Sequence, residues 1–194
     1  MRRVHPIETE SYRILRGMVD LSRFGPLSRA VAERVIHASA DVDYADSLFL
    51  DEAALQRGIE ALRRDAPIVT DVGMVAAGIT GRKTRCLVSD PRTHSLSESL
   101  GITRSAAGFR LAADEVGGGA IWVVGNAPTA LFELLELDVA PALVFGLPVG
   151  FVGAAESKDA LAASGLPAIT NQGPKGGSAV AAAALNALIY YEEE

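Results

Sequence analysis

The stretch AIWVVGNAPTALFELLELDVAPALVFGLPVGFVGAAESK, residues 120–158, decides the fold that we expect for this chain. It contains two consecutive units, each made of an apolar run, a loop rich in Gly and Pro, and a helical pattern. The apolar runs, residues 120–124 and 142–145, show no alternation of polar and apolar side chains, which is typical of parallel strands covered on both faces. Their loops, residues 125–129 and 146–153, would lie at the carboxyl edge of the sheet, where open α/β sheets bind ligands.

The same organisation extends outward from this stretch along most of the chain. Five apolar runs, each followed by a loop and a helical pattern, lie near residues 68, 86, 122, 143 and 169. Such a series predicts parallel strands joined by right-handed crossovers. We therefore expect an α/β, flavodoxin-like three-layer α/β/α sandwich with a five-stranded parallel sheet in the order 2-1-3-4-5. Residues 73–81 are expected to form a loop at its switch point, and Asp71 beside them needs a hydrogen-bond partner if it is buried.

Length and composition favour a single domain over residues 1–194. Hydrophobic residues make up 49% of the chain and charged residues 22%, which is enough to build one sizeable core. Residues 1–65 carry helical patterns without a strand pattern. We expect them to form an N-terminal helical segment that packs on an α/β core of residues 66–190.

Charge and cysteine content exclude several classes of protein. The net charge of −6 and the scattered Lys and Arg residues argue against nucleic-acid binding. The single cysteine, Cys86, excludes a disulfide framework and a cysteine metal cluster. Residues 1–10 lack the apolar core of a signal peptide, and no run of about 18 apolar residues suggests a membrane span. We therefore expect a cytoplasmic protein that binds neither nucleic acid nor membrane.

The helix expected from Pro26 carries the first candidate site. Its predicted buried stripe consists of Leu27, Val31, Val35 and Ala38. Arg34 and His37, three residues apart, would lie together along one flank. Histidine exchanges protons near neutral pH and a guanidinium binds carboxylates, so this pair suits acid–base work on an anionic substrate. A surface helix with two polar residues is the alternative interpretation. A metal site of His37 with Asp41 and Asp43 competes with a solvated acidic turn.

Two further residues are candidates for binding an anion. Arg104 falls in the first turn of a helix over residues 103–116, where free N–H groups and a guanidinium together favour anions, although an ordinary surface arginine fits equally. Lys175, in NQGPKGGS at residues 171–178, precedes a helix N-terminus that would help it to hold negative charge. Ser11 lies within a helical pattern, where serine is usually solvated. The glycine clusters match neither G-x-G-x-x-G nor a Walker A loop.

Seven blocks of sequence carry a resemblance to a known family. They are HPIETESYRIL at 5–15, RVIHASADVDYA at 34–45, DVGMVAAGI at 71–79, TRSAAG at 103–108, WVVGNAPTAL at 122–131, PVGFVGAAESK at 148–158 and KGGSAVAAAALNAL at 175–188. Together they span nearly the whole chain, and they resemble the precorrin-8X methylmutase family of cobalamin biosynthesis.

The resemblance implies a cytoplasmic homodimer of flavodoxin-like subunits. It also implies an isomerase that moves a methyl group between neighbouring carbons of ring C in precorrin-8X, giving hydrogenobyrinate, or cobyrinate from the cobalt form. The reaction needs proton delivery but no external cofactor and no metal site in the protein. The proton donor or acceptor is then His37, and Ser11 and Arg34 contact the substrate. Arg104 and Lys175 would bind its acetate and propionate groups.

Two other functions compete with this interpretation. A non-catalytic tetrapyrrole carrier would hold the same molecule without converting it. A flavin- or nucleotide-binding flavodoxin-like protein would use the same fold, but the missing phosphate-loop fingerprint argues against it.

Overall fold

The computed structural model describes residues 5–192, and a twisted sheet runs through the centre of this part of the chain. Its parallel strands lie side by side in the order β5, β4, β3, β2. Their bounds are β2 (Ile68–Thr70), β3 (Ile121–Val124), β4 (Leu143–Gly146) and β5 (Ala168–Asn171). Every residue of β2, β3 and β4 is buried, which confirms that both faces of these strands are covered.

The fifth strand differs from the expected one. It is β1 (Leu48–Phe49), which pairs antiparallel with β5 at the edge of the sheet, so the sheet is mostly rather than wholly parallel. The prediction of a second strand near residue 86 was wrong, because the chain forms no strand there. Arg85 forms one parallel bridge with Val69 beside β2, on the expected side of the sheet. The carbonyl of Leu87 then accepts a hydrogen bond from Thr93 Oγ1 at 2.7 Å, which draws the chain away from the sheet.

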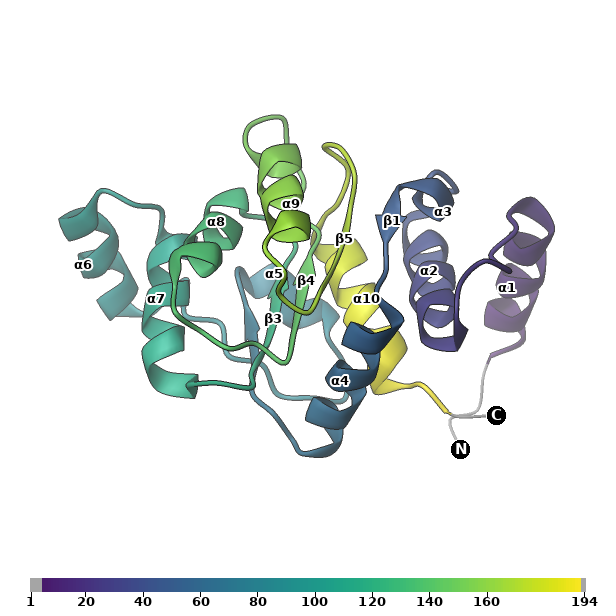
Figure 1. Ribbon diagram of the computed structural model, residues 1–194, viewed down its shortest axis with the longest axis horizontal. Helices are drawn as coiled ribbons and strands as arrows, with labels where there is room; N and C mark the ends of the chain where they lie inside the picture. The colour runs from purple at the N-terminus through teal and green to yellow at the C-terminus, as the bar shows by residue number, and fades with distance from the viewer. Residues whose placement is uncertain (1–4, 193–194) are drawn as a thin grey trace.

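Helices cover both faces of the sheet, as expected for a three-layer α/β protein (Figure 1). On one face lie α7 (Arg104–Val116), α8 (Pro128–Glu136) and α9 (Ala154–Ala163), with α6 (Pro91–Leu100) packed outside α7. On the other lie α4 (Glu52–Arg63), α5 (Gly73–Gly78) and α10 (Ser178–Ile189). The residues of β3 alternate between the two layers. Ile121 and Val123 join the core beneath α10, and Trp122 joins the core beneath α7 and α8.

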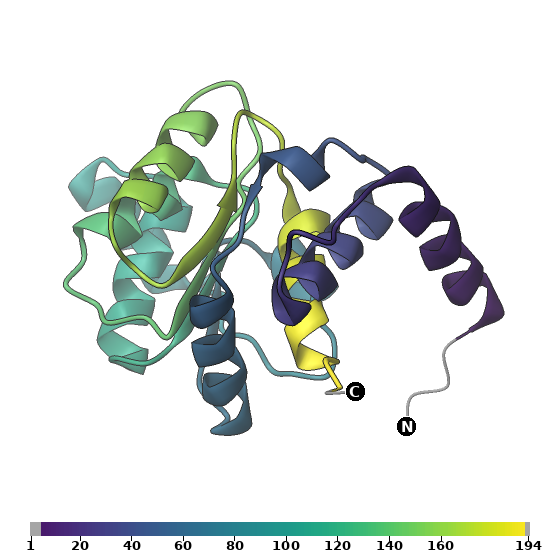
Figure 2. The same ribbon diagram turned by 45° about the vertical axis from the view of Figure 1, so that its right-hand side comes forward.

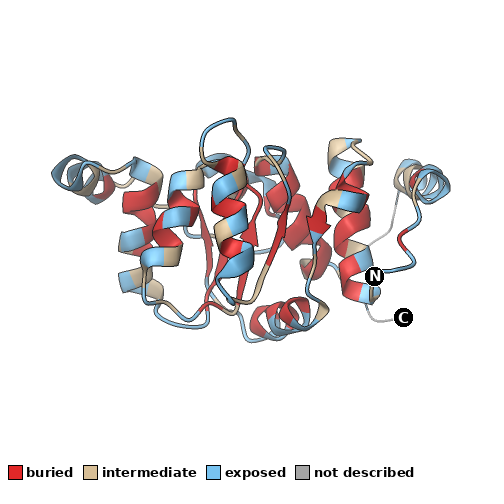
Figure 3. Cartoon of the chain, turned by 45° about the horizontal axis from the view of Figure 1, so that its top comes forward, coloured by how far each residue is buried: buried red, intermediate tan, exposed pale blue. Residues whose placement is uncertain are grey.

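The N-terminal helices form an additional layer outside α10. Their bounds are α1 (Pro6–Met18), α2 (Pro26–Ser39) and α3 (Tyr44–Ser47). Helix α2 packs on α10, and α1 packs on the far side of α2, at the end of the molecule (Figure 2). Along α1 only Leu15 is buried, whereas Ile7, Ile14 and Met18 are exposed. Most of this helix has the colour of exposed residues in Figure 3. Polar contacts therefore contribute much of what holds α1 in place.

Helix α5 replaces the loop expected over residues 73–81. Asn186 of α10 hydrogen-bonds the main chain at the C-terminal end of α5. The Nδ2 of Asn186 donates to the Gly78 carbonyl at 2.8 Å, and its Oδ1 accepts from the Thr80 N–H at 3.1 Å. A Cβ on Gly78 would lie 2.7 Å from the Cβ of Ala182, so glycine permits this close approach of α5 to α10. None of the described helices combines the length and apolar character that crossing a membrane requires.

Candidate active site

Helix α2 carries the candidate histidine, and its first turn is held by a side chain from α4. Pro26 occupies the first helical position after Gly25, which has no side chain to cap the helix. The carboxylate of Glu52 takes over this role and accepts the N–H groups of Leu27 at 2.8 Å and Ser28 at 2.9 Å. A Cβ on Gly25 would lie 2.6 Å from Glu52 Cδ, so the missing side chain makes room for the carboxylate.

A cavity of about 730 Å³ opens between α1, α2 and α10. Arg34, His37 and Ala38 of α2 form one wall, joined by residues 5, 7 and 8 at the start of α1. Its floor is α10, which presents Ala179, Ala182, Ala183 and Asn186 together with Gly78 of α5. Ala38 was expected in the buried stripe but is exposed, because it faces this open cavity. The small floor residues leave the space open to a large, flat ligand.

Two residues of α1 contact His37 directly. The Oγ of Ser11 lies 2.8 Å from His37 Nδ1, so the two side chains share a hydrogen bond. The ring of Tyr12 stacks on the imidazole with a centroid distance of 4.9 Å and an interplanar angle of 15°. These contacts fix the orientation of the imidazole and occupy Nδ1, which leaves Nε2 for a molecule in the cavity.

Arg34, one helical turn before His37, is also anchored by α1. Its Nη1 donates to Glu8 Oε1 at 2.7 Å and to the Tyr12 hydroxyl at 3.2 Å. Burial lowers the pKa of the guanidinium, but the hydrogen bonds and charges of Tyr12 and Glu8 outweigh it and raise the pKa above its usual value. Further along, Arg16 of α1 makes a bidentate ion pair with Glu33 of α2, at 2.7 and 2.9 Å. Along α1, Ser11 thus lies between two residues that pair with α2, Glu8 and Arg16.

The other two candidate residues lie apart from this cavity. Arg104 is exposed at the start of α7, in the helical layer on the opposite face of the sheet. Lys175 precedes α10, and its Nζ lies 2.7 Å from a carboxylate oxygen of both Asp41 and Asp43. Of the five candidates, Ser11, Arg34 and His37 are therefore brought together, and Arg104 and Lys175 are not.

The considered metal site is not formed. Asp41 and Asp43 bind Lys175, while the Nδ1 of His37 bonds with Ser11. Within residues 5–192, no group of three or more His, Cys, Asp or Glu side chains is placed to hold a metal ion.

Two buried charged groups shape the loops at the carboxyl edge of the sheet. Asp71, expected to need a partner, accepts the N–H groups of Gly125, Asn126 and Ala127 at 3.2, 2.8 and 2.7 Å. Burial raises the pKa of its carboxyl and outweighs these three hydrogen bonds. Lys158 is 1% exposed, and burial lowers the pKa of its ammonium to about 8. Both groups act within the scaffold, away from the walls of the cavity.

Glu8, Tyr12 and Asn186 belong to the site but were not predicted from the sequence. Glu8, Ser11 and Tyr12 are spaced by three and four residues, so they share one face of α1. That spacing could have indicated that the three act together. Asn186 is a polar residue within an otherwise apolar helix, a position that calls for a specific hydrogen-bond partner.

The three-layer fold and the His37 cavity define the class of the chain: an α/β protein whose N-terminal helices form, with α10, a cavity with space for a large ligand. Comparisons with known proteins identify it further. The model of the family described as precorrin-8X methylmutase matches residues 6–191. The chain belongs to the precorrin-8X methylmutase family, as the resemblance of its seven sequence blocks predicted.

Individual relatives agree along nearly the full length. The cobalt-precorrin-8 methylmutase of Salmonella typhimurium is 44% identical over 200 residues, which cover 97% of this chain and 95% of that protein. The precorrin-8X methylmutase of Sinorhizobium sp. is 43% identical over 194 residues, covering 94% and 92%. The crystal structure of a precorrin-8X methylmutase from Thermus thermophilus has a TM-score of 0.86 and 37% identity, covering 94% of this chain and 93% of that one. The chain is thus an isomerase of cobalamin biosynthesis with precorrin-8X methylmutase activity.

Proposed function

We propose that this isomerase moves a methyl group between neighbouring carbons of ring C in precorrin-8X, or in its cobalt form, with His37 as proton donor and acceptor. The product would be hydrogenobyrinate or cobyrinate. The observation that carries the proposal is the 2.8 Å contact of Ser11 Oγ with His37 Nδ1 on the wall of the 730 Å³ cavity. An imidazole held in this way combines a fixed orientation with ready proton exchange near neutral pH.

The stoichiometry of an isomerisation allows one group both to give and to take the proton. Substrate and product contain the same atoms, so a proton added as the conjugated system reorganises must be balanced by one removed. In the imidazolium form of His37, Nδ1–H donates to Ser11 Oγ and Nε2–H faces the cavity. His37 would give the Nε2 proton to the substrate, which leaves a neutral imidazole, and would take a proton back at Nε2 as the rearranged ring system is neutralised. The methyl group migrates within the substrate.

Arg34 is the proposed ligand of a peripheral carboxylate. A guanidinium has five N–H donors, and the bonds to Glu8 and Tyr12 use Nη1. The remaining donors would bind an acetate or propionate group of the tetrapyrrole through charge-assisted hydrogen bonds. Beneath the macrocycle, the small side chains of α10 would provide an apolar floor.

The remaining expectations stay predictions. Arg104 and Lys175 are expected substrate ligands because of their charge and their places beside helix N-termini. A location in the cytoplasm and a homodimer are implied by the family resemblance. Phe151 and Val152 are 99% and 89% exposed, and exposed apolar side chains of this kind support a surface for association. Sedimentation equilibrium tests the homodimer, for which we expect twice the 20.3 kDa mass of the chain.

The reaction is tested by incubating the purified protein with precorrin-8X and, separately, with its cobalt form. We expect the absorption spectrum to change as the conjugated system reorganises. The NMR spectrum of the product should place one ring C methyl group on the neighbouring carbon. A bound tetrapyrrole whose spectrum and methyl positions are unchanged would instead identify a carrier, and would contradict the proposal.

A further inference from the structure

An ion cluster joins the turn after α2 to the loop before α10, and both of these helices line the His37 cavity. Lys175 lies in the loop before α10, and its Nζ is 2.7 Å from Asp41 Oδ2 and 2.7 Å from Asp43 Oδ2. Asp41 and Asp43 follow α2 directly, in the turn that leads into α3. The cluster therefore links the C-terminal end of α2 to the N-terminal end of α10.

The main chain of Lys175 is held by hydrogen bonds from two buried side chains. Its carbonyl accepts a hydrogen bond from Lys158 Nζ at 2.6 Å and another from Asn171 Nδ2 at 2.9 Å. Lys158 and Asn171 are each 1% exposed, so these donors are held inside the protein. The next residue, Gly176, packs so closely on the carbonyls of Leu147 and Pro148 that a side chain would not fit. The ammonium of Lys175 thus extends from a rigid base.

The acidic end of the cluster is fixed relative to His37. His37 lies in the last turn of α2, which ends at Ser39. The Oγ of Ser39 accepts the Asp41 N–H at 3.2 Å, and Asp41 Oδ1 accepts the Asp43 N–H at 3.1 Å. Asp41 therefore uses one carboxylate oxygen to order its own turn and the other to bind Lys175. A displacement of this turn would move the helical turn that carries His37.

We propose that Lys175 is a positioning residue, which holds the C-terminal turn of α2, and with it His37, in place over α10. The proposal rests on the proposed role of His37. It differs from the expectation that Lys175 binds substrate, and the charges favour the new role. One ammonium with two carboxylates has a net charge of −1, which would repel rather than attract the carboxylates of a tetrapyrrole.

The ion pair between Asp41 and Lys175 favours the charged form of each group. The hydrogen bond from Lys175 lowers the pKa of Asp41 below its usual value. The bonds to Asp41 and Asp43 raise the pKa of Lys175 above its usual value. Because the three side chains are partly exposed, at 29% for Asp41, 47% for Lys175 and 73% for Asp43, the ion pairs add little to global stability. Their effect should appear in the rate, since small displacements of a reacting group are costly.

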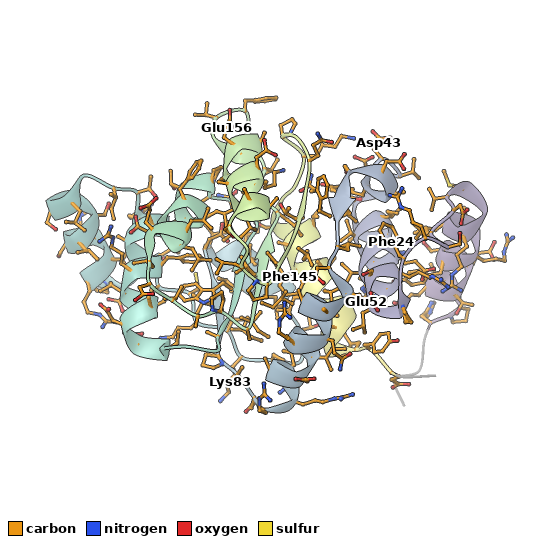
Figure 4. The ribbon with its side chains drawn as sticks, viewed as in Figure 1. Phe24, Asp43, Glu52, Lys83, Phe145 and Glu156 are labelled. Atoms are coloured by element: carbon orange, nitrogen blue, oxygen red, sulfur yellow. The ribbon has the colours of Figure 1, made fainter. Side chains whose placement is uncertain are left out.

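The decisive variant is Lys175→Met, compared with Lys83→Met as a control of the same chemistry. Lys83 is exposed and lies at the lower edge of the molecule in Figure 4, whereas Asp43 lies at its upper right. We expect Lys175→Met to lower kcat about tenfold, while KM changes less than about twofold and Tm matches that of Lys83→Met. Lys175→Arg should restore most of kcat, because it retains the positive charge.

A second variant, Asp41→Asn with Asp43→Asn, separates positioning from substrate binding. Positioning predicts a loss of kcat similar to that of Lys175→Met, because the same ion cluster is broken from its other end. If Lys175 instead binds the substrate directly, Lys175→Met should have a raised KM. The double variant should then have a lowered KM, because Lys175 is released from the two carboxylates and can bind the substrate.

Either that KM pattern, or an unchanged kcat in Lys175→Met, would overturn the proposal. These outcomes leave the role of His37 standing, since that role depends on turnover by variants of His37 itself.

Discussion

Ser11 and His37 lie on different helices, and their hydrogen bond gives the imidazole a defined orientation in the cavity. Replacing Ser11 with Ala removes that bond but keeps the stacking of Tyr12 on the ring. We expect kcat to fall about tenfold with little change in substrate affinity, because proton transfer depends on orientation. Absorbance assays of turnover measure the effect. Ser99→Ala, at an exposed position of α6, is the matched control, and equal kcat values for the two variants would refute the proposed role of Ser11.

Arg34 and Glu8 are the oppositely charged pair on the wall of the cavity, with Nη1 and Oε1 2.7 Å apart. Arg34→Met should raise the substrate dissociation constant about tenfold or more, because a charge-assisted hydrogen bond is lost. The same change leaves Glu8 without its arginine, so the double variant with Glu8→Gln is needed as a reference. Titration of each variant with substrate measures the constants. If the double variant binds as tightly as the wild type, Arg34 does not bind a carboxylate.

At the scale of the elements, Lys158 of α9 connects a helix to the loop that precedes α10. Burial lowers the pKa of its ammonium from 10.5 to about 8, so the unfolded chain binds more protons than the folded chain between these pH values. The free energy of unfolding should therefore rise with pH in that window, by about 3 kcal/mol at most from this group. Below about pH 8 the buried charge is present and its cost is constant.

The comparison with Lys158→Met isolates this contribution, since all other groups titrate alike in both proteins. Urea denaturation at pH 7.5 and pH 10 measures it. We expect the wild type to gain stability relative to the variant at the higher pH. A difference in stability that does not depend on pH would rule out a depressed pKa for Lys158.

Gly125, at the end of β3, sets the distance between the sheet and α10. A Cβ there would lie 2.8 Å from Val75 Cγ2, 2.9 Å from Ala181 Cβ and 2.9 Å from Ser178 Cα. Gly125→Ala should therefore destabilise the protein by about 1–3 kcal/mol through overpacking. Gly73→Ala is the control, because a Cβ on Gly73 would meet no atom within 4 Å. Denaturant midpoints that fall equally for both variants would refute the overpacking argument.

The central elements could be predicted because their sequences are apolar throughout. Strands β2 to β5, and the helices that follow β3, β4 and β5, agree with the periodicity. The segments that were predicted wrongly are those whose conformation depends on contacts with other parts of the chain. Residues 84–88 resemble a strand, yet Leu87 turns away to bond with Thr93. Strand β1 has two residues, too few for a pattern, and α5 depends on the cap from Asn186, which is distant in the sequence.

At the scale of the whole molecule, the α/β core and the N-terminal helices have different roles. The stretch of residues 120–158 forms part of the sheet and of the helical layer on one face, while the side chains proposed to act on the substrate come from the N-terminal helices packed on α10. Family resemblance found Ser11, Arg34 and His37, which α1 and α2 bring together. It could not find that Lys175 is held by Asp41 and Asp43, because that contact depends on how the turn after α2 meets the loop before α10.

The most direct test of proton transfer by His37 is turnover by His37→Ala with precorrin-8X, measured together with the dissociation constant of the product. His37 lies on one wall of the cavity, and the floor of the cavity consists mainly of small alanine residues of α10. Binding should therefore survive when the imidazole is removed. We predict a turnover rate reduced by about 10²–10⁴-fold, with a product dissociation constant within a few-fold of the wild-type value. Turnover within a few-fold of the wild type would contradict the central claim that His37 transfers the proton.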